Sequence, residues 1–128
     1  MLFPVIQILL LSGTSQMPDY QIIQMRNEAP EVVKVGDDFF VRVYYMCPFW
    51  IIDLKLNITN ATNIQTKAAL PILLEHPGDK ELLVLIPFKA LNLGRGNCGI
   101  IITGKSKKSK TYTTYKGVTI VNLKIQGS

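Results

Sequence analysis

The fold is decided by the stretch FFVRVYYMC, which runs from Phe39 to Cys47. It is rich in aromatic and β-branched residues, the types that favour a pleated, half-buried strand. The charge of Arg42 must face solvent, and because side chains alternate along a strand this fixes the phase. The opposite face therefore carries the side chains that we expect in the core: Phe39, Val41, Val43, Tyr45 and Cys47.

Six further segments have the pattern of short strands. In Ile51 to Ile58, apolar residues from Ile52 onward alternate with Asp53, Lys55 and Asn57, which are expected to face outward. Glu81 to Ile86 is apolar after its first residue and stops at Pro87, so we expect it to be buried on both faces. The other segments are Tyr20 to Met25, Lys67 to Leu74, Cys98 to Thr103 and Val118 to Ile125. With turn residues between them and no helical period, they predict an all-β fold, an Ig-like or fibronectin-III-like seven-stranded antiparallel β-sandwich.

Length and composition indicate one compact domain. The chain has 128 residues, a usual size for a single domain, and its 48% hydrophobic against 18% charged residues argue against intrinsic disorder. The 14 Lys and Arg against 9 Asp and Glu give a formal charge of +5. We expect a secretory signal peptide over residues 1–15 and a single β-sandwich domain over residues 16–128.

The signal peptide is inferred from the first residues. Met1 to Leu11 is an uncharged apolar stretch, and the small residues of Ser12 to Ser15 follow it. The alternative is a first strand with a Ser/Gly turn, because the usual positive charge at the start is missing. No apolar run approaches the roughly 20 residues that span a bilayer, so no transmembrane segment is expected. The predicted location is extracellular.

Two further patterns agree with export. Asn57-Ile58-Thr59 and Asn60-Ala61-Thr62 are consecutive acceptor sites for N-linked glycans, and the strand phase turns Asn57 away from the core. Cys47 and Cys98 form an even pair, which in an oxidising compartment predicts a disulfide. The alternative interpretation of this pair is two buried free thiols.

A cluster of positive charge lies between the last two predicted strands. It consists of four lysines, Lys105, Lys107, Lys108 and Lys110. At the tip of a hairpin they would attract an anionic partner such as heparan sulfate, a lipid headgroup or an acidic protein. The alternative is a solvated loop. Nucleic acid is not expected as a partner, because the tip contains no aromatic residue on which bases would stack.

No combination of residues indicates catalysis. His76 is the only histidine and has no nucleophile signature near it, so we interpret it as a surface turn residue and predict no metal site. Gly94, Gly96 and Gly99 have the spacing of a dinucleotide-binding loop, but a strand follows them where a helix is required, so they predict a tight turn. Trp50 is expected to cap the core. We therefore expect no enzyme activity and no cofactor.

Features along most of the chain carry a family resemblance. They are the signal peptide, Tyr20 to Ile23, Pro30, the turn Val35 to Asp38, the strand residues Phe39, Val41 and Val43, and the segments Ile52 to Ile58, Leu82 to Pro87, Leu93 to Gly94 and Ile100 to Gly104. In this order they resemble the first macroglobulin-like domain of the thioester-containing family, which includes alpha-2-macroglobulin and complement components. The thioester motif Gly-Cys-Gly-Glu-Gln does not occur in this sequence. The resemblance therefore implies a scaffold or interaction domain and not thioester chemistry.

These observations lead to two functional hypotheses. The first is a secreted, non-enzymatic β-sandwich module that works through contacts with a protein or glycan partner. The alternative is a small secreted carrier that holds a lipid or another apolar ligand between its sheets, which the excess of Leu, Ile and Val suggests.

Overall fold

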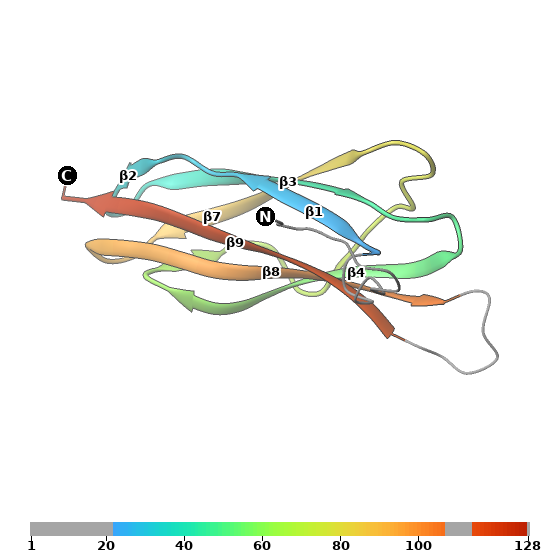
Figure 1. The fold of residues 1–128 in the computed structure, drawn as a ribbon. Helices are drawn as coiled ribbons and strands as arrows, with labels where there is room; N and C mark the ends of the chain where they lie inside the picture. Colours follow the sequence, from blue (N-terminus) through green and yellow to red (C-terminus); the bar gives the residue numbers. More distant parts are fainter. Residues whose placement is uncertain (1–21, 107–113, 128) are drawn as a thin grey trace, which may run out of the picture.

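The computed structural model describes residues 22–106 and 114–127, which form two β-sheets packed face to face (Figure 1). These residues contain no helix, and therefore none long and apolar enough to cross a membrane. The predicted signal peptide lies outside the described residues. The strands are β1 (Gln24–Glu28), β2 (Val32–Lys34), β3 (Asp38–Met46), β4 (Ile51–Thr62), β5 (Ile64–Thr66), β6 (Ile72–Leu73), β7 (Leu82–Ala90), β8 (Gly94–Ser106) and β9 (Thr114–Gln126).

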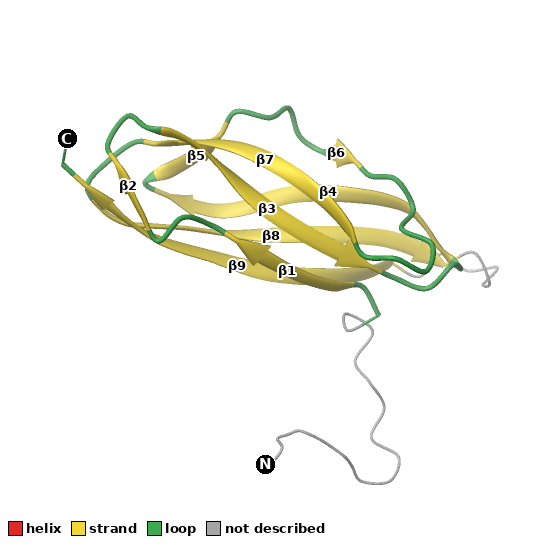
Figure 2. Ribbon diagram, turned by 90° about the horizontal axis from the view of Figure 1, so that it is seen from above, coloured by secondary structure: helices red, strands yellow, loops and turns green. Residues whose placement is uncertain are grey.

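The two sheets have four and five strands. The four-stranded sheet has the order β1-β3-β7-β5, and all its pairs are antiparallel. The five-stranded sheet has the order β2-β9-β8-β4-β6, in which β2 runs parallel to β9 and the other pairs are antiparallel. Figure 2 shows both sheets from above, with β5 and β7 on one long side and β1 and β9 on the other. The β-sandwich prediction is confirmed.

The core follows the alternation predicted around Arg42. All five side chains assigned to the inward face of Phe39 to Cys47 are buried. Phe39 stacks on Phe88 of β7 at 5.7 Å between ring centroids. The inward residues of β4, β8 and β9 fill the space from the other side, and burying each such side chain contributes about 1.5–3 kcal/mol. The interior between the sheets is thus occupied by the protein's own side chains.

Short strands account for the difference between seven predicted and nine observed strands. The segment Lys67 to Leu74 contributes only β6, while β2 and β5 were not predicted. Each of these three has two or three residues, which is too short for a period of two to stand out from a loop. The first strand runs from Gln24 to Glu28, later than the predicted Tyr20 to Met25.

The prediction for β7 was wrong in two respects. Pro87 does not end the strand but lies inside it. The carbonyl of Pro87 accepts a hydrogen bond from the N–H of Lys67, just beyond β5. Because the nitrogen and the carbonyl of one residue point to the same side of an antiparallel strand, the nitrogen of Pro87 also faces β5. A missing donor does little harm beside such a short edge strand. The run is also not buried on both faces, because Leu83 and Leu85 are 48% and 50% exposed on the outer side of the sheet.

A bulge shifts the start of β4. Asp53 adopts a φ of 57°, and the register with β8 changes between Ile52 and Lys55. Ile51 is therefore fully buried, while Ile52, which was expected to point inward, is only half-buried. From Leu54 onward the predicted alternation is confirmed, and Asn57 is exposed.

The glycine-rich segment forms the start of β8 instead of a complete turn. Gly94 has a φ of 112°, as a tight turn requires, but Gly96 and Gly99 lie within the strand. A β-carbon on Gly96 would lie 2.8 Å from Cγ2 of Ile64, so glycine here permits close contact between the two sheets.

Candidate functional site: the outer face of the five-stranded sheet

Basic side chains gather on the outer face of the five-stranded sheet. Register partners project to the same side of a sheet, and Lys55 of β4, Thr103 of β8 and Lys116 of β9 form one such cross-strand row. Towards the other end of the same strands, Arg95 is the direct partner of Lys124. We define the basic face as the exposed side chains of Lys55, Arg95, Lys105, Lys116 and Lys124.

Four of the five basic side chains are not neutralised by nearby acids. Four ion pairs lie on the other sheet and its flanks, with N–O distances between 3.0 and 3.7 Å: Arg26–Glu28, Arg26–Glu81, Arg42–Glu28 and Lys67–Asp38. Within the described residues, Lys55, Arg95, Lys116 and Lys124 form no ion pair. Like charges that face each other across strands repel. A bound anion would relieve this repulsion.

The centre of the same face is apolar. Val118 and Ile120 of β9 are 45% and 58% exposed, and their register partners on β8 are Ile101 and Gly99. A rise of about 3.3 Å per residue puts Lys116 and Lys124 about 26 Å apart along β9. The face therefore presents two basic ends that are separated by a flat apolar strip.

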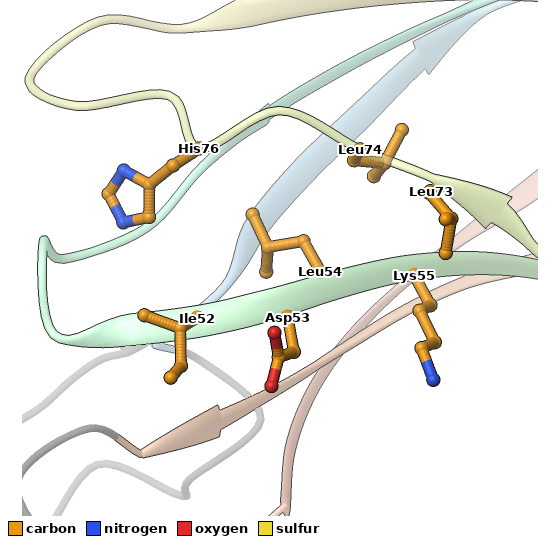
Figure 3. A pocket seen from close by; sticks show the side chains of 7 residues that line it. All are labelled: Ile52, Asp53, Leu54, Lys55, Leu73, Leu74 and His76. Carbon is orange, nitrogen blue, oxygen red and sulfur yellow. The ribbon is translucent and has the colours of Figure 1, made fainter.

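A groove lies where the basic face meets the edge of the sheet. Its volume is about 540 Å³, and Figure 3 shows the side chains that line it. Asp53 and Lys55 project from one side of β4, while Leu54 projects from the other side towards Leu74. Asp53 is the single acidic side chain that we find on the outer side of β4, β8 and β9 in the described chain.

The groove ends at His76, whose ring is held in the predicted turn. Nδ1 accepts a hydrogen bond from the N–H of Gly78 at 2.9 Å, so the ring proton is on Nε2, which lies 3.1 Å from the carbonyl of Pro48. The placement of His76 in an exposed turn is confirmed. No group of three or more His, Cys, Asp or Glu that could hold a metal ion occurs in the described residues.

The two predicted glycan acceptors lie on β4 beside this apolar strip. Asn57 is opposite Ile101, which in turn is opposite Val118, so the three form one row of the outer face. Asn60 is exposed in a left-handed conformation with a φ of 52°, where the register with β8 shifts again. Both side chains are on the surface, and their glycosylation stays a prediction.

The predicted disulfide does not form in this structure. Cys47 and Cys98 are both buried, as expected from their inward phase, but they are free thiols. Cys47 precedes a tight turn that leads to Ile51, which pairs with Ser106 at the far end of β8. Eight residues along a strand separate Ser106 from Cys98, about 26 Å, whereas a disulfide needs Cα atoms within roughly 7 Å.

Burial also makes these thiols chemically inert. Desolvation raises the pKa of Cys47 and of Cys98 to about 11. At neutral pH both are protonated, and only a thiolate acts as a nucleophile or a metal ligand.

Trp50 has the structural role expected of it. It packs edge-to-face against Tyr115 at 5.6 Å between ring centroids and lies half-buried against the core.

The predicted lysine cluster is described only in part. Lys105 belongs to the basic face, and Lys107, Lys108 and Lys110 lie outside the described residues. The last two predicted strands do pair as an antiparallel hairpin, β8 with β9.

Four of the five side chains of the basic face were not among the sequence-predicted site residues. The outward positions of Lys55 and Lys124 were recognised from the alternation along their strands. The same alternation, continued along β8 and β9, also places Arg95 and Lys116 on the outer side. The missing information was the register, because only strand pairing brings residues 55, 95, 116 and 124 onto one surface.

Comparison with known proteins shows the fold. No family model and no curated protein matches the sequence. Among solved structures, one match is native alpha-2-macroglobulin from Escherichia coli, from domain MG7 to the C-terminus, with a TM-score of 0.68 and 15% identity over 82% of this chain and 16% of that one. Another is a cryo-EM reconstruction of the native conformation of alpha-2-macroglobulin from the same organism, with a TM-score of 0.59 and 15% identity over 94% of this chain and 7% of that one.

This chain thus has a macroglobulin-like fold. The resemblance inferred from the sequence is confirmed at that level, although the match is not specifically to a first domain. The chain spans less than a fifth of either solved protein.

Proposed function

We propose that this protein is an extracellular, non-enzymatic interaction module that binds a sulfated polysaccharide through its basic face. The observation that carries the proposal is the segregation of charge. Four ion pairs lie on and around the four-stranded sheet, whereas β4, β8 and β9 of the five-stranded sheet present five basic side chains and Asp53. A concentrated positive field of this kind attracts polyanions and speeds their association.

The shape of the face supports an extended ligand. The basic ends lie about 26 Å apart along β9, so a linear chain with repeated sulfates could contact both ends while passing over Val118 and Ile120. The predicted lysine cluster would extend this surface, because Lys105 is its first member and lies on the basic face.

The chemistry of the described residues supports a binding role over catalysis. The thiols are buried and protonated, and Nδ1 of the sole histidine is engaged by its own turn. The alternative function, a carrier of an apolar ligand between the sheets, has less support because packed side chains occupy that space.

Heparin chromatography of the secreted protein tests the proposal. The variant Lys55→Ser/Lys116→Ser removes two charges from the basic face, and its control Lys80→Ser/Lys89→Ser removes two exposed charges elsewhere. We expect the first variant to elute at clearly lower salt than the control, although both have the same net charge. Equal elution would mean that heparin binding depends only on the net charge of the protein, and this would overturn the proposal.

Intact-mass analysis of the secreted product tests export. We expect the loss of residues 1–15, and retention of Met1 would contradict export.

A further inference from the structure

Strand β7, which with nine residues is as long as β3, is paired on one side over only part of its length. β3 pairs with β7 from Leu82 to Lys89, but β5 on the other side pairs only with Phe88 to Ala90. The bond from Lys67 to Pro87 ends this second ladder. Within the described residues, the segment Leu82 to Ile86 has no strand on its β5 side. We call this segment the open edge.

Hydrogen bonds along the strand show which residues face the open side. The carbonyl of Pro87 accepts from Lys67, and the N–H of Leu91 donates to Asn63 at 2.8 Å, so the odd-numbered residues of this strand face β5. Ala90, by contrast, bonds through its N–H to Asp37 on the β3 side. This alternation is regular along an antiparallel strand without a bulge.

The same alternation fixes the backbone groups of the open edge. Leu83 and Leu85 direct their N–H and C=O groups away from β3, past the end of β5. None of these four groups has a hydrogen-bond partner within the described residues. The side chains of both leucines are about half exposed, at 48% and 50%.

The open edge lacks the devices that usually protect such edges. Natural edges are blunted by charges, prolines or bulges, but Leu82 to Ile86 is a regular run of apolar residues. The opposite side of the sandwich is closed by contrast. There the amide nitrogen of Asn27 on β1 donates to Thr119 Oγ1 at 2.7 Å and to the carbonyl of Ile120 at 2.8 Å, both on β9.

We propose that the open edge binds the open edge of a second copy of this chain. The two β7 strands would pair antiparallel about a two-fold axis at Val84. Leu83 of each copy then stands opposite Leu85 of the other, and the four free groups of each copy form four backbone hydrogen bonds in total. The same pairs bring the exposed leucine side chains together, a cross-strand contact that stabilises a sheet. The two four-stranded sheets become one continuous sheet.

Complementarity argues for a second copy as the occupant. The edge offers two donors and two acceptors in a palindromic arrangement, which its own copy matches through an isologous interface. In this register the new pairing runs from Leu82 opposite Ile86 to Ile86 opposite Leu82. It ends there because Lys67 of each copy already occupies the position opposite Pro87. The contact is short against the 1,200 Å² or more that stable interfaces bury, and the dimer is therefore weak and depends on concentration.

Hydrogen exchange at individual amides tests the pairing. We expect the amides of Leu83 and Leu85 to exchange fast in dilute protein and to become protected as the concentration rises. The amides of Val84 and Ile86 face β3 and serve as internal controls that are protected throughout. Fast exchange of Leu83 and Leu85 at every concentration would overturn the proposal without any substitution.

Sedimentation velocity tests the assembly itself. Leu83→Lys/Leu85→Lys places repelling charges at the edge, and we expect it to remain monomeric at concentrations where the wild type dimerises. The matched control Val118→Lys/Ile120→Lys adds the same charge at exposed apolar positions of the other sheet and is expected to dimerise. A dimer that survives the first variant, or one that the control abolishes equally, contradicts pairing through β7. Heparin elution is a separate measurement, so failure here leaves the basic face unaffected.

Discussion

The backbone carbonyl of Ile23 lies where a β-carbon on Gly117 would have to be, so that only glycine fits at this position without a shift of the backbone. Ile23 immediately precedes β1 and Gly117 belongs to β9, so this contact joins the two sheets along one side of the sandwich. Neither residue is notable in the sequence, because the contact spans almost the whole length of the domain.

We predict that Gly117→Ala lowers the free energy of unfolding by about 1–3 kcal/mol, the usual cost of forcing an extra carbon into a packed site. The obstacle is backbone, which cannot rotate away as a side chain could. Urea denaturation measures the effect. Gly127→Ala is the control, because its new carbon would meet only Leu93 at an ordinary 3.8 Å. Equal stability of the two variants would contradict the close contact.

Alkaline conditions should destabilise the fold through its buried thiols. An unfolded chain loses these protons near the ordinary pKa of 9.0, whereas burial raises the pKa of Cys47 and Cys98 to about 11. The raised values favour the folded state fully below pH 9, and this contribution is lost as the pH rises towards 11. In urea titrations between pH 8 and 10.5, Cys98→Ala is expected to lose stability less steeply than the wild type. Parallel slopes would contradict this.

A glycan on Asn57 should compete with polyanion binding. Asn57 lies in the row next to that of Lys55 and Lys116, so an attached sugar chain would cover part of the basic face. Thr59→Ala removes this acceptor site, and Thr62→Ala removes only that of Asn60. Once intact mass has shown glycans on both sites, we expect Thr59→Ala to raise the salt needed for heparin elution more than Thr62→Ala does. The reverse order would place the polyanion elsewhere.

The lysine cluster should add to the same interaction. Changing Lys107, Lys108 and Lys110 to Ser is expected to lower the salt of heparin elution and to shift the thermal midpoint little, because surface substitutions usually change stability by no more than about 0.5 kcal/mol each. Elution identical to the wild type would mean that the cluster is a solvated turn and that the basic face acts alone.

The sequence predicted the features that depend on neighbouring residues. The alternation around Arg42 was sufficient to place β3, and the outward phase of Asn57 and Lys55 was correct. Features that depend on distant partners were missed or wrong. Pro87 is tolerated within β7 because its nitrogen, which has no hydrogen to donate, faces the short edge strand β5. The bulge at Asp53 moved Ile52 out of the core. Cys47 and Cys98 both point inward, but they lie at opposite ends of the sandwich.

The basic face shows the same division. Each of its side chains could be assigned to an exposed position from local alternation, but no local pattern shows that Arg95 faces Lys124 or that Thr103 separates Lys55 from Lys116. Register is set by the pairing of whole strands, in which a slip of one residue would turn every side chain to the other face.

The parallel pairing of β2 with β9 also has a consequence for how the chain folds during its synthesis. Val33, near the start of the domain, is the register partner of Ile125, near the end of the described chain. Translation proceeds at about 5–20 residues per second, so several seconds pass between the synthesis of β2 and that of β9, its partner strand. The second sheet cannot close until the ribosome has released β9. Until then the apolar inner side of the nascent sandwich stays uncovered, and the chain is most exposed to aggregation in these seconds.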